Sequence, residues 1–188
     1  MKKGIALILS LTLLAMAAAC FAESSVIETM AGLEWSFCSG AGAWSTDLQI
    51  QADGSFTGEY HDSDMGDSAD DYPDGTVYSC VFSGRISLVG QVDEHTWEIR
   101  VDELNKEETE EAIIDGVRYI PSEPYGLSEG DIMLLYSPGT PVSVLPDEMQ
   151  LWAHLMDQEN PPSELEDWFL RSDANESGFV GYRQIETP

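Results

Sequence analysis

The sequence predicts a mainly β domain, in which an antiparallel meander of about eight strands closes into a barrel, with a β-sandwich as the alternative. Three observations favour this fold class. Apolar and polar residues alternate with a period of two over several segments, short turns separate these segments, and helical spacing of apolar residues occurs only after residue 145. The chain is 43 % hydrophobic, and we find no linker that divides it, so we expect one domain with one sizeable core.

The first 22 residues have the three-part layout of a secretory signal peptide. Lys2 and Lys3 precede the apolar run IALILSLTLLAMAAA, which is shorter than the roughly 20 apolar residues of a membrane-spanning helix. Two kinds of processing remain open: cleavage after Ala22, which we favour, or lipoprotein processing that leaves a lipidated Cys20 at the N-terminus. We therefore expect bacterial-type export to a secreted or envelope-attached location, with residues 23–188 forming the single domain.

The predicted strands in the first half of the chain follow one another through short turns. LEWSF is the first, and WSTDLQI (44–50) alternates apolar and polar positions. The turn ADGS then leads into a return strand that begins at Phe56. Residues 76–89 alternate again, with Gly84 marking a bulge or bend, and we expect them to pair with residues 96–104.

The second half of the chain combines strands with short helices. IIDGVRYI predicts a small hairpin, and DIMLLY predicts a strand buried on both faces. Residues 145–170 are expected to form a helical cover for the barrel: LPDEMQLWAHLM has helical spacing, and Ser163 and Glu166 form a capping box for a second short helix in PPSELEDWFL. A closing strand is predicted at 179–184.

Cysteine and histidine give little support for catalysis. Once Cys20 is removed or lipidated, Cys38 and Cys80 are left, either as a disulfide or as two small buried thiols. Neither cysteine has the spacing of a zinc ligand. The three histidines are interpreted as ordinary surface or edge residues, so we name no catalytic residue.

The charge of the chain restricts its partners. Removing residues 1–22 takes two of the eight basic side chains and none of the 35 acidic ones, which leaves a formal charge of −29. A field of this sign repels nucleic acid and attracts divalent cations and basic proteins.

The acidic stretch EYHDSDMGDSADDYPDG (59–75) holds seven carboxylates and no Lys or Arg. Three interpretations remain open: a solvated loop between two strands, a calcium site, or a recognition surface for a basic protein partner. Calcium takes six to eight oxygen ligands, and the glycines of the stretch would let carbonyl groups join the carboxylates, although the spacing is not that of an EF-hand. The candidate ligands are Asp62, Asp64, Asp67, Asp70, Asp71 and Asp74.

GAGAWSTDLQIQADGSFTGEY, YSCVFSGRI and YGLSEGDIMLLYSPGTP resemble a group of uncharacterised exported bacterial proteins, some of them lipoproteins. The β-rich domain of that group, a domain of unknown function, is similar to lipocalin-type barrels. The resemblance covers roughly residues 33–145, and Gly42-Ala43-Trp44 matches the G-x-W element of lipocalins. It implies a lipocalin-like barrel and an exported protein; no functional residues are carried over from it.

Three functions follow as hypotheses. The first is a non-enzymatic module that binds a small apolar or amphipathic ligand in the barrel interior or at its mouth. The second is a calcium-stabilised envelope or interaction protein that uses the acidic stretch, and the third is a secreted hydrolase whose site we cannot name. The candidate ligand pocket of the first consists of aromatic residues at inward-facing positions: Trp44, Phe56, Tyr78, Phe82 and Trp97.

Overall fold

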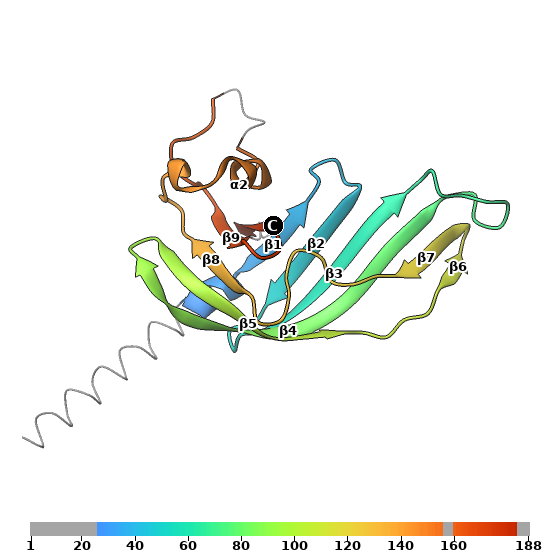
Figure 1. The fold of residues 1–188 in the computed structure, drawn as a ribbon, viewed down its shortest axis with the longest axis horizontal. Coiled ribbons are helices and arrows are strands. Elements are labelled where there is room, and N and C mark those ends of the chain that lie inside the picture. Colours follow the sequence, from blue (N-terminus) through green and yellow to red (C-terminus); the bar gives the residue numbers. More distant parts are fainter. Residues whose placement is uncertain (1–25, 156–159, 184–188) are drawn as a thin grey trace, which may run out of the picture.

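The computed structural model describes residues 26–155 and 160–183, which form an antiparallel β-barrel with two additional strands (Figure 1). Residues 26–31 are helical. The later elements are β1 (Leu33–Cys38), β2 (Trp44–Ile50), β3 (Ser55–Asp64), β4 (Thr76–Asp93), β5 (Thr96–Lys106), β6 (Ala112–Ile114), β7 (Val117–Pro121), β8 (Ile132–Tyr136), a 3₁₀ turn (Val142–Val144), α2 (Asp147–Trp152), β9 (Trp168–Ser172) and β10 (Ser177–Arg183).

Eight strands close the barrel, so the expected fold class is confirmed and the sandwich alternative is not formed. Each of β1 to β5 pairs with the next strand, β5 pairs with β8, and β8, β9 and β10 follow in order. The pairing of β10 with β1 closes the circle. Closure leaves no free edge within the barrel itself.

The period-two segments of the sequence form the strands that they predict. β2 and β3 join through the expected turn, where Gly54 has a φ of 80° and a side chain would meet the carbonyl oxygen of Ile86. β4 pairs with β5 as expected, and the first shift in their register lies just after Gly84, between Arg85 and Ile86.

Side chains pack the barrel interior. The ring of Phe82 lies over Gly58 and that of Phe56 lies over Gly84, and the two rings are 6.4 Å apart in an edge-to-face arrangement. At the start of β1, the helix at 26–31 adds Met30, whose carbonyl accepts a hydrogen bond from the Trp35 indole. The glycines therefore make room for aromatic rings inside the barrel.

The connection between β7 and β8 lies across the opposite end of the barrel. The Thr46 hydroxyl donates to the carbonyl oxygen of Tyr125 at 2.9 Å, and the Ser177 hydroxyl donates to that of Gly126. Gly126 lies against the Phe37 ring, closer than a side chain would allow. Because Thr46 belongs to β2 and Ser177 to β10, these bonds hold the connection over the end of β1, the strand between them.

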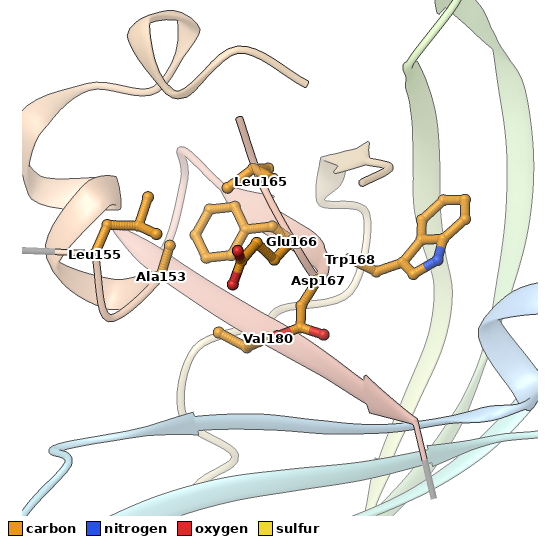
Figure 2. Close-up of a pocket in the computed structure, with 8 residues that line it drawn as sticks. Ala153, Leu155, Leu165, Glu166, Asp167, Trp168 and Val180 are labelled. Atoms are coloured by element: carbon orange, nitrogen blue, oxygen red, sulfur yellow. The ribbon is translucent and has the colours of Figure 1, made fainter. Parts of the chain in front are cut away.

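An outer layer covers β8, β9 and β10. Tyr136, Phe169 and Val180 point away from the interior and pack with Leu145, Met149 and other side chains from residues 142–165. Figure 2 shows Leu155 and Leu165 above Val180 in this layer, with the Trp168 ring turned away. α2 confirms the first helix of the predicted cover.

The second predicted helix is wrong. In the part of the chain that the structure describes, no helix follows the expected cap, Ser163: Glu164 forms an isolated bridge with Pro141, and Trp168–Ser172 forms β9. Phe169 packs into the outer layer, whereas Leu170 belongs to the barrel core, so this strand is buried on both faces. The sequence of such a strand is a continuous run of apolar residues. The spacing of apolar residues in that run does not distinguish the strand from a buried helix.

Cys38 and Cys80 are free thiols, so the disulfide alternative is not formed. Cys38 pairs with Ser45, which pairs with His61, which pairs with Ser79, the neighbour of Cys80. Three strand spacings put the two cysteines roughly 14 Å apart along the wall, whereas the Cα atoms of a disulfide are about 4.4–6.8 Å apart. Cys80 is buried, as the alternative of two small buried thiols expects, whereas Cys38 is only half-buried.

The predicted signal peptide, with Cys20, lies outside the described residues. Within 26–155 and 160–183, no helix has the length and apolar character needed to cross a membrane.

Candidate functional site

A pocket lies beside the end of β1, where the chain turns toward β2. We call it the mouth pocket, and its volume is about 250 Å³. It is lined by Cys38, Ser39, Gly40, Trp44, Leu151, Trp152 and His154. Three separate segments thus build it: the end of β1 with the following turn, the start of β2, and α2 with the residues after it.

Aromatic rings form the floor of the mouth pocket. The ring centres of Trp44 and Trp152 are 5.8 Å apart, and each packs edge-on against Phe37, at 4.8 and 5.0 Å. Tyr125 stacks on Phe37 at 5.6 Å, packs edge-on against Trp44 at 5.4 Å, and is itself 45 % exposed. The two half-buried tryptophans therefore present fixed aromatic surface at the rim of a buried cluster.

The local sequence explains why these side chains meet. β1 alternates, so Phe37 points into the core while Cys38 lies on the outer face. The chain then reverses through Gly40 and Gly42, whose φ angles of 72° and 78° suit glycine, and returns at Trp44. A Cβ atom placed on Gly40 would lie 3.7 Å from Cε1 of the His154 ring, an ordinary contact distance, so the two segments lie side by side.

Polar groups at the pocket are few. The thiol of Cys38 and Nε2 of His154 are 3.9 Å apart, and His154 adopts a φ of 56°, in the left-handed region. The Ser39 hydroxyl oxygen is fully buried, and among the residues that the structure describes it has no hydrogen-bond partner. A buried hydroxyl without a partner is costly, so it calls for an explanation, such as backbone strain, a catalytic role, or a bound water or ion.

The structure separates the five aromatic residues that sequence analysis grouped as a ligand pocket. Phe56 and Phe82 are buried against each other in the core, and Trp97 lies 5.8 Å from Trp168, half-buried. Tyr78 is half-buried on β4. Trp44 alone among the five lines the mouth pocket.

The carboxylates of the acidic stretch do not converge. Among the described residues, no three His, Cys, Asp or Glu side chains are grouped so that they could hold a metal ion. Asp64 instead accepts hydrogen bonds from the backbone N–H groups of Gly66, at 2.8 Å, and Asp67, at 3.2 Å. The Asp67 carboxylate lies 3.9 Å from the Arg118 guanidinium. This geometry gives no support to the predicted calcium site, since the stretch does not present a preformed set of ligands.

The other two histidines have polar contacts away from the mouth pocket. A ring nitrogen of His61 lies 3.2 Å from the Ser45 hydroxyl, and that of His95 lies 3.0 Å from the Ser137 hydroxyl. His154, also interpreted from the sequence as an ordinary residue, lines the mouth pocket. No local sequence signal could place it beside Cys38, because the two are 116 positions apart.

Two further hollows are less suited to an organic ligand. The one in Figure 2, between Leu155, Leu165 and Val180, has a volume of about 50 Å³, room for water only. The other lies beside Val92, Tyr136 and Val144 and has a volume of about 380 Å³, larger than that of the mouth pocket. No buried hydroxyl without a partner lines it among the described residues.

No protein-family model, curated protein or solved structure matches this chain.

Proposed function

We propose that this protein is a non-enzymatic binding module that holds a small planar aromatic molecule in the mouth pocket. The observation that carries the proposal is the buried hydroxyl of Ser39, without a partner among the described residues, in a pocket walled by Trp44 and Trp152. A ligand with a hydrogen-bonding group would satisfy this hydroxyl while its ring packs against the indoles.

The pocket limits the size of the ligand. Its volume of about 250 Å³ lies just below the roughly 300–1,000 Å³ of sites for drug-sized molecules. We therefore expect a compact ligand of two or three fused rings. Side chains such as Phe56 and Phe82 fill the barrel interior. This packing favours a binding site at the rim over one at the centre of the barrel.

The charge of the chain selects among such ligands. The whole chain has a formal charge of −27, so it repels anionic molecules. The faces of Trp44 and Trp152 also attract cations. A neutral or cationic aromatic amine is therefore favoured over an aromatic carboxylate.

Binding fits the polar groups of the pocket better than catalysis does. The Cys38 thiol and Nε2 of His154 are 3.9 Å apart, a long sulfur–nitrogen contact, and a pocket walled by tryptophan rings with few polar groups is typical of a ligand-binding site. We assign these two groups to contacts with the polar edge of the ligand.

We further propose that the protein works outside the cytoplasm, secreted or attached to the cell envelope. Support comes from the N-terminal sequence, where two lysines precede an apolar run and small residues follow.

The proposal is tested with 1-aminoanthracene, a neutral fluorescent aromatic amine, titrated into the chain from Glu23 to Pro188. We expect its fluorescence to rise on binding, and the Trp152→Ala variant to bind at least about tenfold more weakly. Trp97→Ala is the matched control, because Trp97 packs against Trp168 outside the pocket and its loss should leave the affinity unchanged.

Trp152 also contacts both apolar clusters, so its variant needs a check of folding by circular dichroism. Ser39→Ala avoids this problem because it removes one oxygen atom. Equal affinity for the wild type, Trp152→Ala and Ser39→Ala would place the dye elsewhere and overturn the assignment of the site, as would an absence of binding to the wild type.

A further inference from the structure

An arm that projects from the barrel carries an unpaired strand edge, independent of the mouth pocket. β7 pairs in parallel with the first residues of β4, and β6 pairs with β7 (Figure 1). On its other side β6 has no partner strand within the part of the chain that the structure describes. We call residues 59–79 and 107–121 together the acidic arm.

The two halves of the acidic arm form one unit. The N–H of Asp74 donates to the carbonyl of Gly116, and the N–H of Arg118 donates to that of Gly75, both at 3.0 Å. The Arg118 guanidinium donates to Glu111 at 2.7 Å and lies 5.4 Å from the centre of the Tyr72 ring. These contacts attach the β6–β7 hairpin to the acidic stretch and hold the edge of β6 in place.

The backbone of Ile113 faces outward at this edge. Ile114 and Val117 flank a two-residue turn in which Asp115 and Gly116 have φ angles of 50° and 83°. In such a hairpin the pair that flanks the turn exchanges hydrogen bonds, and the next pair does not. The N–H and C=O of Ile113 therefore point away from β7, toward an incoming strand.

Apolar side chains surround the free backbone groups. Ile113 is 46 % exposed and Ile114 is 56 % exposed, which is unusual for isoleucine in a strand. On the same arm Tyr119 is 37 % exposed and Met65 is 72 % exposed. An unpaired edge with exposed apolar side chains is a template for a further strand.

Charge decides which strand would bind. The acidic arm holds twelve acidic residues and one basic residue, Arg118, which already pairs with Glu111. The segment before β6, residues 107–111, is exposed and carries four glutamates. A second copy of this chain would bring the same negative charge to the edge and be repelled, whereas Lys and Arg side chains would be attracted.

We propose that the edge of β6 is a docking site for a basic, extended segment of another protein, which adds to the sheet as a further strand. Its backbone pairs with that of Ile113, and its apolar side chains pack on one face of the sheet, beside Ile114. Its Lys and Arg side chains lie near the glutamates of residues 107–111. The acidic arm, of which the acidic stretch is one half, thereby acts as a recognition surface, which is one of the three roles that the sequence left open for the stretch.

The experiment measures fluorescence anisotropy of a labelled peptide, Lys-Val-Lys-Val-Lys-Val-Lys, with the chain from Glu23 to Pro188. Ile113→Pro removes the outward N–H and should weaken binding about tenfold or more, without loss of a hydrogen bond to β7. Ile113→Thr is the matched control: it keeps the backbone groups in a residue suited to strands, so it should retain most of the affinity. Circular dichroism and the melting temperature check that the variants fold alike.

A second peptide separates strand addition from simple attraction of charges. Replacing its central valine by proline keeps every lysine but prevents pairing as a strand, and we expect this peptide to bind about tenfold more weakly. If both peptides bind equally to the wild type and to Ile113→Pro, the attraction is only electrostatic and the docking site is refuted. No binding of the first peptide refutes it too. A dimer of the wild type that Ile113→Pro abolishes would identify a second copy as the occupant, contrary to the proposal.

Discussion

Replacing Ser39 with alanine is expected to stabilise the ligand-free protein. Its hydroxyl oxygen is buried and has no partner among the described residues, and a buried polar group in that state costs about 1–3 kcal/mol. The residue as a whole is half-buried at the rim of the mouth pocket, so we take the lower end, about 1 kcal/mol. The backbone hydrogen bond from Ser39 to the carbonyl of Trp44, at 3.2 Å, does not depend on the side chain.

The assay is thermal unfolding of the chain from Glu23 to Pro188, followed by circular dichroism. A gain of about 1 kcal/mol in the free energy of unfolding raises Tm by about 2–4 °C for a domain of this size. Ser45→Ala is the matched control, because the Ser45 hydroxyl donates to Asp47 at 2.6 Å and its loss should lower Tm.

Opposite effects of Ser39→Ala on stability and on binding are the decisive result. The same substitution that raises Tm should weaken the affinity for 1-aminoanthracene. The unpaired hydroxyl destabilises the ligand-free protein, whereas in the complex it forms a hydrogen bond with the ligand. If Ser39→Ala lowers Tm as Ser45→Ala does, the hydroxyl already has a partner in the free protein, and the reasoning is refuted.

Three further predictions concern the core, the acidic stretch and the thiols. Gly58→Ala should lower the free energy of unfolding by about 1–3 kcal/mol, because the new methyl group would lie 2.3 Å from the Phe82 ring, whereas Gly90→Ala meets no atom within 4 Å and should have little effect; urea denaturation compares the two. Calcium and magnesium at equal ionic strength should raise Tm equally by screening the negative charge, and a rise specific to calcium would contradict the geometry of the acidic stretch. Burial raises the pKa of the Cys80 thiol, so at pH 8 a thiol reagent should modify half-buried Cys38 first; equal rates would show that the core opens.

Most of the barrel could be predicted from the sequence, because its strands have one solvent-exposed face and tight turns connect them. β2 and β3 alternate in hydrophobicity on either side of an Asp-Gly turn, so both their existence and their pairing follow from local residues. β9 could not be recognised in this way. The outward-facing side chains of this strand are apolar because the outer layer, which α2 helps to build, covers them. This burial is a tertiary effect that local periodicity does not reveal.

The mouth pocket was less accessible to sequence analysis than the fold. Trp44, one of the five aromatic residues predicted as a ligand site, lines the mouth pocket, but its neighbours Cys38, Trp152 and His154 come from outside the pattern that grouped the five. Alternation tells which side of a strand a residue occupies, and it does not tell which distant segment covers that residue. That the Ser39 hydroxyl has no partner among the described residues is likewise a property of packing, without a sequence signal.

The barrel has a packed interior, so we expect its binding surfaces outside the interior. The mouth pocket and the edge of β6 both lie in the electric field of the acidic residues. Trp44 of the mouth pocket pairs with Asp62 in the register of β2 and β3, so the acidic arm begins beside the pocket. A cationic aromatic ligand should therefore associate faster than a neutral one of the same shape, and added salt should reduce this difference. Salt should likewise slow docking of a basic strand at β6, but it should leave the affinity of a neutral ligand nearly unchanged, because ring packing and the hydrogen bond to Ser39 involve no ions. The salt dependence of the two binding events thus separates what charge contributes from what shape contributes.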